Sequence, residues 1–182
     1  MKEYSKEEGE KLLKLARESI NEEFGGKKPE LPEGKKFKQA RGVFVTLNKQ
    51  GKLRGCIGFP YPNFSVGQAI YKAAKQAAFS DPRFRPLKQE ELKEVEIEIS
   101  VLSMPQECSE KDIKIGEDGL MCQCLGYSGL LLPQVATEYN MSRIEFIEAL
   151  CEKAGLPKST WQNRNFKLYK FQAEIFNEEK DK

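Results

Sequence analysis

The sequence predicts an α+β fold, in which a mainly antiparallel sheet that could close into a barrel is flanked by helices. Two kinds of segment lead to this prediction. Short stretches of alternating apolar residues recur between turn residues, and amphipathic stretches with complete helix-start signals stand between them. The order hairpin, helix, returning strand occurs twice, which predicts two related strand-strand-helix-strand halves.

The N-terminal segment predicts a helix over residues 5–24. Ser5 and Glu8 form a capping box, and apolar residues follow at helical spacing. In the first half, residues 43–47 then predict a strand, and residues 48–51 turn the chain into a second strand. This segment is therefore expected to be a hairpin with a longer loop.

The first half continues with a helix and a returning strand. Ser65 and Gln68 form another capping box, at the start of an amphipathic helix that Asp81-Pro82 ends. Residues 95–101 alternate strictly between apolar and polar side chains, which is typical of a half-buried strand.

The second half repeats this order with different residues. Residues 119–125 and 128–132 predict a strand pair, Pro133 opens one helix, and Ser142 caps another. Residues 166–176 predict one last strand, whose apolar pattern changes phase and so indicates a bulge. The two lobes are expected at approximately 37–105 and 113–176.

Composition limits the classes of protein and of site. A chain of 182 residues fits one compact domain, and its net charge of +2 argues against a broad nucleic-acid-binding surface. With no apolar run of 18 residues and no signal peptide, the protein is expected to be cytoplasmic, without a membrane partner. Five cysteines at uneven spacing argue against a disulfide framework.

The chain contains no histidine, which is the most restrictive feature of its composition. Ser-His and Cys-His hydrolase mechanisms are therefore excluded, and the commonest transition-metal ligand is missing. Cys122 and Cys124 would share one strand face about 7 Å apart, an awkward spacing for one ion. No metal site and no cofactor are predicted.

Residues 52–59 carry the strongest candidate for chemistry. As a regular strand they would place Arg54, Cys56 and Gly58 on one face, with Gly55 among the apolar residues of the other. A guanidinium beside a thiol favours the thiolate, and a glycine leaves room for a ligand. The alternative is that Cys56 is simply a small side chain that fits a tight strand.

Two further segments offer polar groups. Residues 81–86, Asp-Pro-Arg-Phe-Arg-Pro, form a loop that two prolines make rigid, and such loops often carry function. Alternatively, Asp81 ends the helix and pairs with a nearby arginine. Gln134, at a predicted helix start, could meet an anion, although the protein often caps such a start itself.

Three segments together resemble the AMMECR domain, named for the Alport syndrome, mental retardation, midface hypoplasia and elliptocytosis chromosomal region. They are Leu-Arg-Gly-Cys-Ile-Gly at 53–58, Asp-Pro-Arg-Phe at 81–84 and Leu-Leu-Pro-Gln-Val-Ala at 131–136. The resemblance covers nearly the whole chain and implies a single AMMECR-type domain over residues 1–182. It implies an intracellular α+β protein with two related halves.

For function, the resemblance implies less. The family has been suggested to act in transcription, replication, repair or translation. Its bacterial and archaeal members are associated with Memo-like and radical S-adenosylmethionine proteins, which points to a metabolic or modification pathway. The resemblance assigns no established biochemical activity.

Two functional hypotheses follow, and the residues do not decide whether the protein is an enzyme. In the first, a small anionic ligand binds near residues 52–59, with Cys56 and Asp81 in catalytic roles and ligand contacts from Arg54, Arg83, Gln134, Gly55 and Gly58. In the second, a non-catalytic module binds RNA, DNA or a protein through exposed arginines and aromatics, namely Arg41, Arg83, Arg85, Phe84 and Trp161. A third interpretation is plain sheet packing, with Arg54 paired to an acid such as Asp81.

Overall fold

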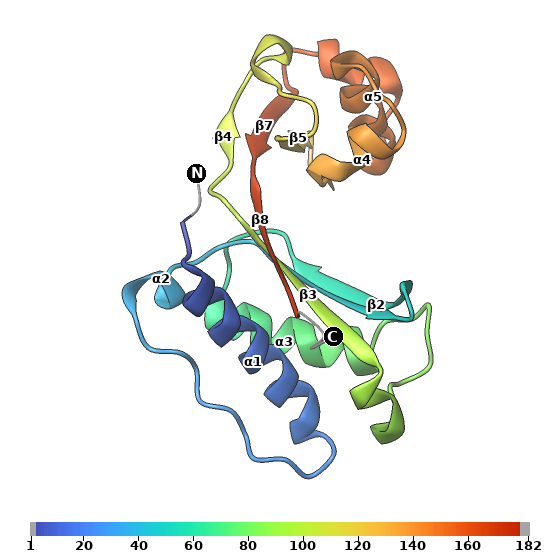
Figure 1. Cartoon of the computed structure of the whole chain (residues 1–182). Helices are drawn as coiled ribbons and strands as arrows, with labels where there is room; N and C mark the ends of the chain where they lie inside the picture. Colours follow the sequence, from blue (N-terminus) through green and yellow to red (C-terminus); the bar gives the residue numbers. More distant parts are fainter. Residues whose placement is uncertain (1–2, 179–182) are drawn as a thin grey trace. The chain divides into compact units, whose positions relative to one another are not determined.

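The computed structural model describes residues 3–178, and in it the chain forms two compact units (Figure 1). The first unit contains the described residues up to Leu102 together with those from Glu174 onward. The second unit extends from Ser103 to Ala173. The first unit therefore combines both ends of the described chain.

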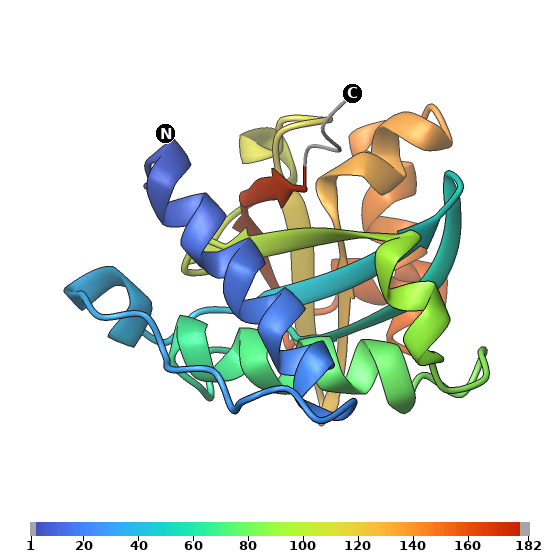
Figure 2. The ribbon, with the colours of Figure 1, turned by 60° about the horizontal axis from the view of Figure 1, so that its bottom comes forward.

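The first unit consists of one sheet with helices on one face. Its strand order is β2-β1-β3-β8, so β2 and β8 are the outer strands. Helices α1 and α3 pack against each other and against the strands, as Figures 1 and 2 show. The helical elements are α1 (Lys6–Glu22), α2 (Lys35–Lys38), α3 (Val66–Phe79) and the 3₁₀ turn η1 (Gln89–Lys93), and the strands are β1 (Val43–Lys49), β2 (Lys52–Phe59), β3 (Val95–Leu102) and β8 (Ala173–Asn177).

The sequence signals explain where these elements begin. The predicted capping boxes at Ser5 and Ser65 are present at the starts of α1 and α3. Strand β1 buries Val43, Val45 and Leu47 completely, and the residues between them are only half-buried. The predicted hairpin of β1 and β2 is confirmed, with β3 pairing on the other side of β1.

The second unit is a smaller sheet with its own core. Its strand order is β4-β7-β5-β6, and the fully buried side chains Phe146 and Leu150 of α5 form its core with Leu120 of β5. Its elements are β4 (Gln106–Glu107), η2 (Glu110–Asp112), β5 (Gly119–Cys124), β6 (Tyr127–Leu131), α4 (Pro133–Glu138), α5 (Arg143–Lys153), η3 (Lys158–Gln162) and β7 (Lys167–Phe171).

Two details of the predicted fold are wrong. Within residues 3–178 the strands do not close into a barrel, because they form two separate four-stranded sheets, each with two outer strands. The predicted last strand is two strands, since β7 and β8 join different sheets with Gln172 between them. The apolar pattern thus changes phase where the chain passes from one sheet to the other. A bulge within a single strand had been expected at this place.

In the first unit β1 pairs with both β2 and β3, and in the second unit β5 pairs with both β6 and β7, giving the similar orders β2-β1-β3 and β6-β5-β7. A shared order of elements can arise without a common origin, so the predicted duplication stays a prediction. In the described part of the chain, no helix has the length and apolar character needed to span a membrane.

Candidate functional site

A bulge in β2 separates Arg54 from Cys56. Leu47 of β1 pairs with Gly55, but the next residue, Asn48, pairs with Leu53, so that Arg54 has no partner across the hairpin. Because an extra residue changes the phase of a strand, Arg54 leaves the face that Cys56 occupies. The prediction that both side chains share one face is therefore wrong.

Arg54 instead forms a bidentate ion pair with Glu91 of η1. Its Nε donates to Glu91 Oε1 over 3.1 Å, and its Nη2 donates to Oε2 over 2.9 Å. Lys49 Nζ donates to the same carboxylate over 3.2 Å. Hydrogen bonds, first of all from Arg54, lower the pKa of Glu91 to about 2. The charge of Arg54 is thus already balanced within the first unit.

The backbone of Cys56 is held by two side chains from the loop that follows α3. The Asp81 carboxylate accepts a 2.9 Å hydrogen bond from the Cys56 N–H, and Arg83 Nη2 donates to the Cys56 carbonyl oxygen over 3.2 Å. Since β2 is an outer strand, these two side chains take the place that a neighbouring strand would have. The motif at residues 81–84 therefore covers the sheet edge at Cys56.

Asp81 and Arg83 also bind each other. The distances from Arg83 Nε to Asp81 Oδ1 and from Nη2 to Oδ2 are 3.0 and 2.7 Å. Asp81 is buried, and the Arg83 guanidinium and two backbone N–H groups hold the pKa of its carboxyl well below the usual range. Asp81 is therefore ionised at neutral pH and is a poor base, but it is well placed to orient Arg83.

The two glycines of β2 are required by close packing. A Cβ on Gly55 would fall on the backbone carbonyl of Ala77, so β2 and the last turn of α3 are in direct contact there. A Cβ on Gly58 would fall on the ring of Phe44, which already fills the space that a ligand was expected to use. Because Gly55 has no side chain, the end of α3 can pack directly against β2. This packing places Asp81 within hydrogen-bond distance of the Cys56 N–H.

The Cys56 thiol has two polar neighbours within the first unit. Thr46 Oγ1 of β1 donates to its Sγ over 3.3 Å, as expected for directly opposite residues in a closely spaced pair. The Arg83 guanidinium reaches the Cys56 carbonyl oxygen, and the nearby thiol adds, after the larger effect of Asp81, to the raised pKa of Arg83. Cys56 is half-buried, so part of this group is reachable from solvent.

A carboxyl group extends this row across the sheet. Thr46 pairs with Cys56 on one side and with Glu98 of β3 on the other. Burial raises the pKa of Glu98, and within the described residues its side chain has no hydrogen-bond partner to offset that burial. A thiol, a hydroxyl and a carboxyl that is easily protonated thus lie on one face of three adjacent strands.

The other cysteines lie in the second unit and are less suited to chemistry. Burial raises the pKa of Cys108 and of Cys122 to about 11, and it raises the pKa of Cys151 as well. Cys124 is also buried. Within residues 3–178, no group of three or more Cys, Asp or Glu side chains is arranged to hold a metal ion.

Several predicted residues are not among the contacts around Cys56 described above. Gln134 is the second residue of α4 in the second unit, whereas the other six predicted site residues belong to the first. Trp161 packs against the core of the second unit. Arg41 is paired with Glu3 over 2.8 Å, so it does not add to a free basic surface.

Sequence reasoning missed Thr46 and Glu98 as members of this region, and it named Arg85 only for the second hypothesis, a surface that binds RNA, DNA or a protein. The predicted hairpin could have indicated Thr46, which lies opposite Cys56, whereas Glu98 lies opposite Thr46 on β3. Arg85 is exposed on the same loop as Arg83, and within the described chain no ion pair involves it. It is therefore a free positive charge two residues from the Asp81–Arg83 pair.

This fold and this motif set are those of an AMMECR1-type protein. The AMMECR1 family model matches residues 13–176, and the chain therefore belongs to this family. The match includes both units and all seven predicted site residues.

Archaeal proteins are similar to the chain over almost its whole length. The protein TV1384 of Thermoplasma volcanium is 46% identical over 93% of this chain and 89% of its own. The protein PF1979 of Pyrococcus furiosus is 45% identical over 94% of this chain and 88% of its own. The crystal structure of the uncharacterized protein PH0010 from Pyrococcus horikoshii superimposes with a TM-score of 0.83 at 44% identity, covering 94% of this chain and 91% of that one.

Proposed function

We propose that the protein binds a small anionic molecule beside Cys56, with Arg83 and Arg85 as the anion contacts and the thiol as the reactive group. The observation that carries this proposal is the arrangement around one thiol. Thr46 donates to Cys56 Sγ, and the Cys56 N–H and carbonyl oxygen are fixed by Asp81 and Arg83. Such rigid placement suits a site that must hold a ligand in one orientation.

The charges favour Arg83 over Arg54 as the anion contact. Glu91 occupies Arg54 in a bidentate pair whose side chains are 15% and 18% exposed. The Arg83 side chain is 54% exposed, and its Nη1 makes none of the hydrogen bonds described above. The same loop contains Arg85, which has no ion-pair partner in the described chain. Its two arginines therefore exceed its one aspartate by one positive charge. A carboxylate or phosphate group would therefore be attracted to the loop at residues 81–86.

In this proposal Cys56 acts as the nucleophile or as a direct contact, and Asp81 keeps Arg83 in place. Asp81 is not assigned the part of a base, because its ionised form is strongly favoured. Glu98, at the other end of the row through Thr46, is the carboxyl group that can exchange a proton closer to neutral pH. A nucleic-acid-binding module is less favoured, because Arg41 is paired with Glu3 and Trp161 packs against the core of the second unit.

The test is protection of Cys56 from alkylation by small anions. Iodoacetamide modification of the Cys56 peptide is followed by mass spectrometry with and without inorganic phosphate or succinate. We expect either anion to slow modification of the wild-type protein by at least about threefold and to have no effect on Arg83→Gln. Arg54→Gln is the matched control and should behave like wild type. Equal modification rates at all anion concentrations would contradict the proposal.

A further inference from the structure

Among the described residues, no strand pairs with the outer edge of β8, so backbone groups of the first sheet are left without a neighbouring strand there. It is the outer strand in the order β2-β1-β3-β8. The Glu178 N–H donates to the Ile97 carbonyl over 3.0 Å, so Glu178 turns its backbone toward β3. Because this direction alternates along an antiparallel strand, Ile175 and Asn177 turn their N–H and C=O groups outward. Ile175 is also 46% exposed, which is unusual for an isoleucine.

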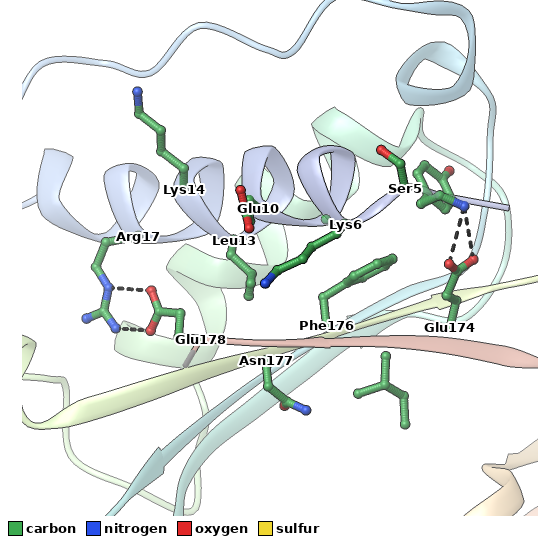
Figure 3. A pocket seen from close by; sticks show the side chains of 13 residues that line it. Ser5, Lys6, Glu10, Leu13, Lys14, Arg17, Glu174, Phe176, Asn177 and Glu178 are labelled. Carbon is green, nitrogen blue, oxygen red and sulfur yellow. Dashed lines mark hydrogen bonds and ion pairs between the residues drawn. The ribbon is translucent and has the colours of Figure 1, made fainter. Parts of the chain in front are cut away.

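A groove lies along this strand, under helix α1 (Figure 3). The Tyr4 N–H donates to the Glu174 carboxylate over 3.2 Å at one end, and Arg17 is paired with Glu178 at the other. The helix and the strand therefore run side by side in the same direction. The groove between them encloses about 690 Å³, a size typical of ligand sites, and includes Leu13 and Phe176 among its lining residues.

The helix wall of this groove presents a regular pattern of charge. Lys6, Glu10 and Lys14 line it at intervals of four residues and are exposed. In the described part of the chain neither Lys6 nor Glu10 has an ion-pair partner, and Lys14 reaches only the exposed Glu18 at 3.8 Å. Figure 3 shows Lys6 extending from α1 beside Phe176, with Glu10 and Lys14 farther along the same helix.

The spacing of these charges matches that of an extended peptide. Four helical residues rise about 6 Å, and two residues of a strand span about 6.7 Å. Side chains at alternate positions of a strand point to the same side. A peptide strand laid along β8 would therefore present every second side chain in turn to Lys6, Glu10 and Lys14.

We propose that β8 binds an extended peptide segment of another protein as a fifth strand of the first sheet. The segment carries acidic, basic and acidic side chains at three alternate positions. Its backbone pairs with Ile175 and Asn177, and its charged side chains meet the α1 wall while their aliphatic parts cover Leu13 and Phe176. The backbone pairing supplies affinity, and the charge pattern supplies specificity.

Two blocked peptides test this proposal by fluorescence anisotropy at low salt. The first has the core Glu-Val-Lys-Val-Glu, and the second has the same core with its charges exchanged, Lys-Val-Glu-Val-Lys. Wild-type protein is expected to bind the first at least about tenfold more tightly than the second. The triple variant Lys6→Glu, Glu10→Lys, Lys14→Glu is expected to reverse this preference. Equal binding of the two peptides by wild type would overturn the proposal.

The backbone pairing is tested separately with Ile175→Pro. Proline removes an N–H that points outward, and outer strands tolerate that loss. Binding of the first peptide should fall at least about tenfold, whereas Ile175→Thr, which keeps the N–H, should fall much less. A peptide N-methylated at alternate residues gives the same test without altering the protein. Undiminished binding in both cases, or a wild-type dimer in sedimentation that Ile175→Pro abolishes, would overturn the proposal.

Discussion

The Asp81 carboxylate accepts a hydrogen bond of 2.9 Å from the backbone N–H of Cys56. This bond joins the end of α3 to the outer strand β2, at a place where a sheet would otherwise leave a donor unpaired. Through the same carboxylate, Arg83 is held beside the Cys56 thiol. The relationship therefore links the stability of the sheet edge to the geometry of the proposed site.

Replacing Asp81 with Asn should destabilise the protein in a pH-dependent way. The pKa of Asp81 is lowered on folding, so its contribution is complete above the unfolded-state pKa of about 4 and is lost as the pH falls. We expect Asp81→Asn to lose about 1–3 kcal/mol of unfolding free energy at pH 7. The difference from wild type should shrink in urea titrations below pH 4. A loss that is the same at pH 3 and pH 7 would contradict this explanation.

Gly55→Ala tests the contact between β2 and α3. The added methyl group would meet the Ala77 carbonyl, which is backbone and cannot move aside without shifting the helix. A loss of at least about 2 kcal/mol is expected from chemical denaturation. Gly51→Ala is the matched control, because Gly51 has open space around it and only its positive φ of 73° opposes a side chain. That change should cost about 1 kcal/mol.

Arg54 and Glu91 should be coupled in stability. Their side chains are mostly buried and form two hydrogen bonds, so removing Glu91 leaves the Arg54 charge poorly paired, and removing Arg54 leaves Glu91 with Lys49 as its ion-pair partner. A double-mutant cycle with Arg54→Ala and Glu91→Gln should give a coupling free energy of about 1–2 kcal/mol. Additive losses would show instead that Arg54 is free for another partner.

Glu98→Gln should stabilise the protein at neutral pH. Burial raises the pKa of Glu98, so its ionised form is unfavourable in the folded state. The favourable contribution of the protonated acid is present below the unfolded-state pKa of about 4.3 and is lost as the pH rises. The variant should therefore have a higher unfolding free energy than wild type at pH 7, and the gain should vanish near pH 4. A destabilised variant at pH 7 would mean that the carboxylate has a favourable partner.

Local sequence signals predicted most of the fold because they act over short distances. Capping boxes at Ser5, Ser65 and Ser142 each require only four consecutive residues, and all three are present. The change from β7 to β8 at Gln172 was not predictable in the same way, because it depends on which sheet each half of the segment joins.

For the site, the residue types were predictable but their grouping was not. Asp81 and Arg83 reach Cys56 because Gly55 lets α3 approach β2, and that approach depends on packing between distant segments. Arg54 was predicted on the wrong face of β2, because a bulge moves the side chains that follow it to the opposite face. Nothing in residues 52–59 marks that bulge in the sequence. Its partner Glu91 lies 37 residues away in the chain.

The most direct test of the central claim compares two alkylating reagents at Cys56. Iodoacetate is anionic and iodoacetamide is neutral, so the ratio of their rates at the Cys56 peptide reports the local attraction for an anion. In the folded protein this ratio should exceed that of the urea-unfolded chain by at least about threefold. Arg83→Gln should return it to the unfolded value, and Arg54→Gln should leave it unchanged. A folded ratio no higher than the unfolded one, or an equal loss in both variants, would contradict an anion site built on Arg83 beside Cys56.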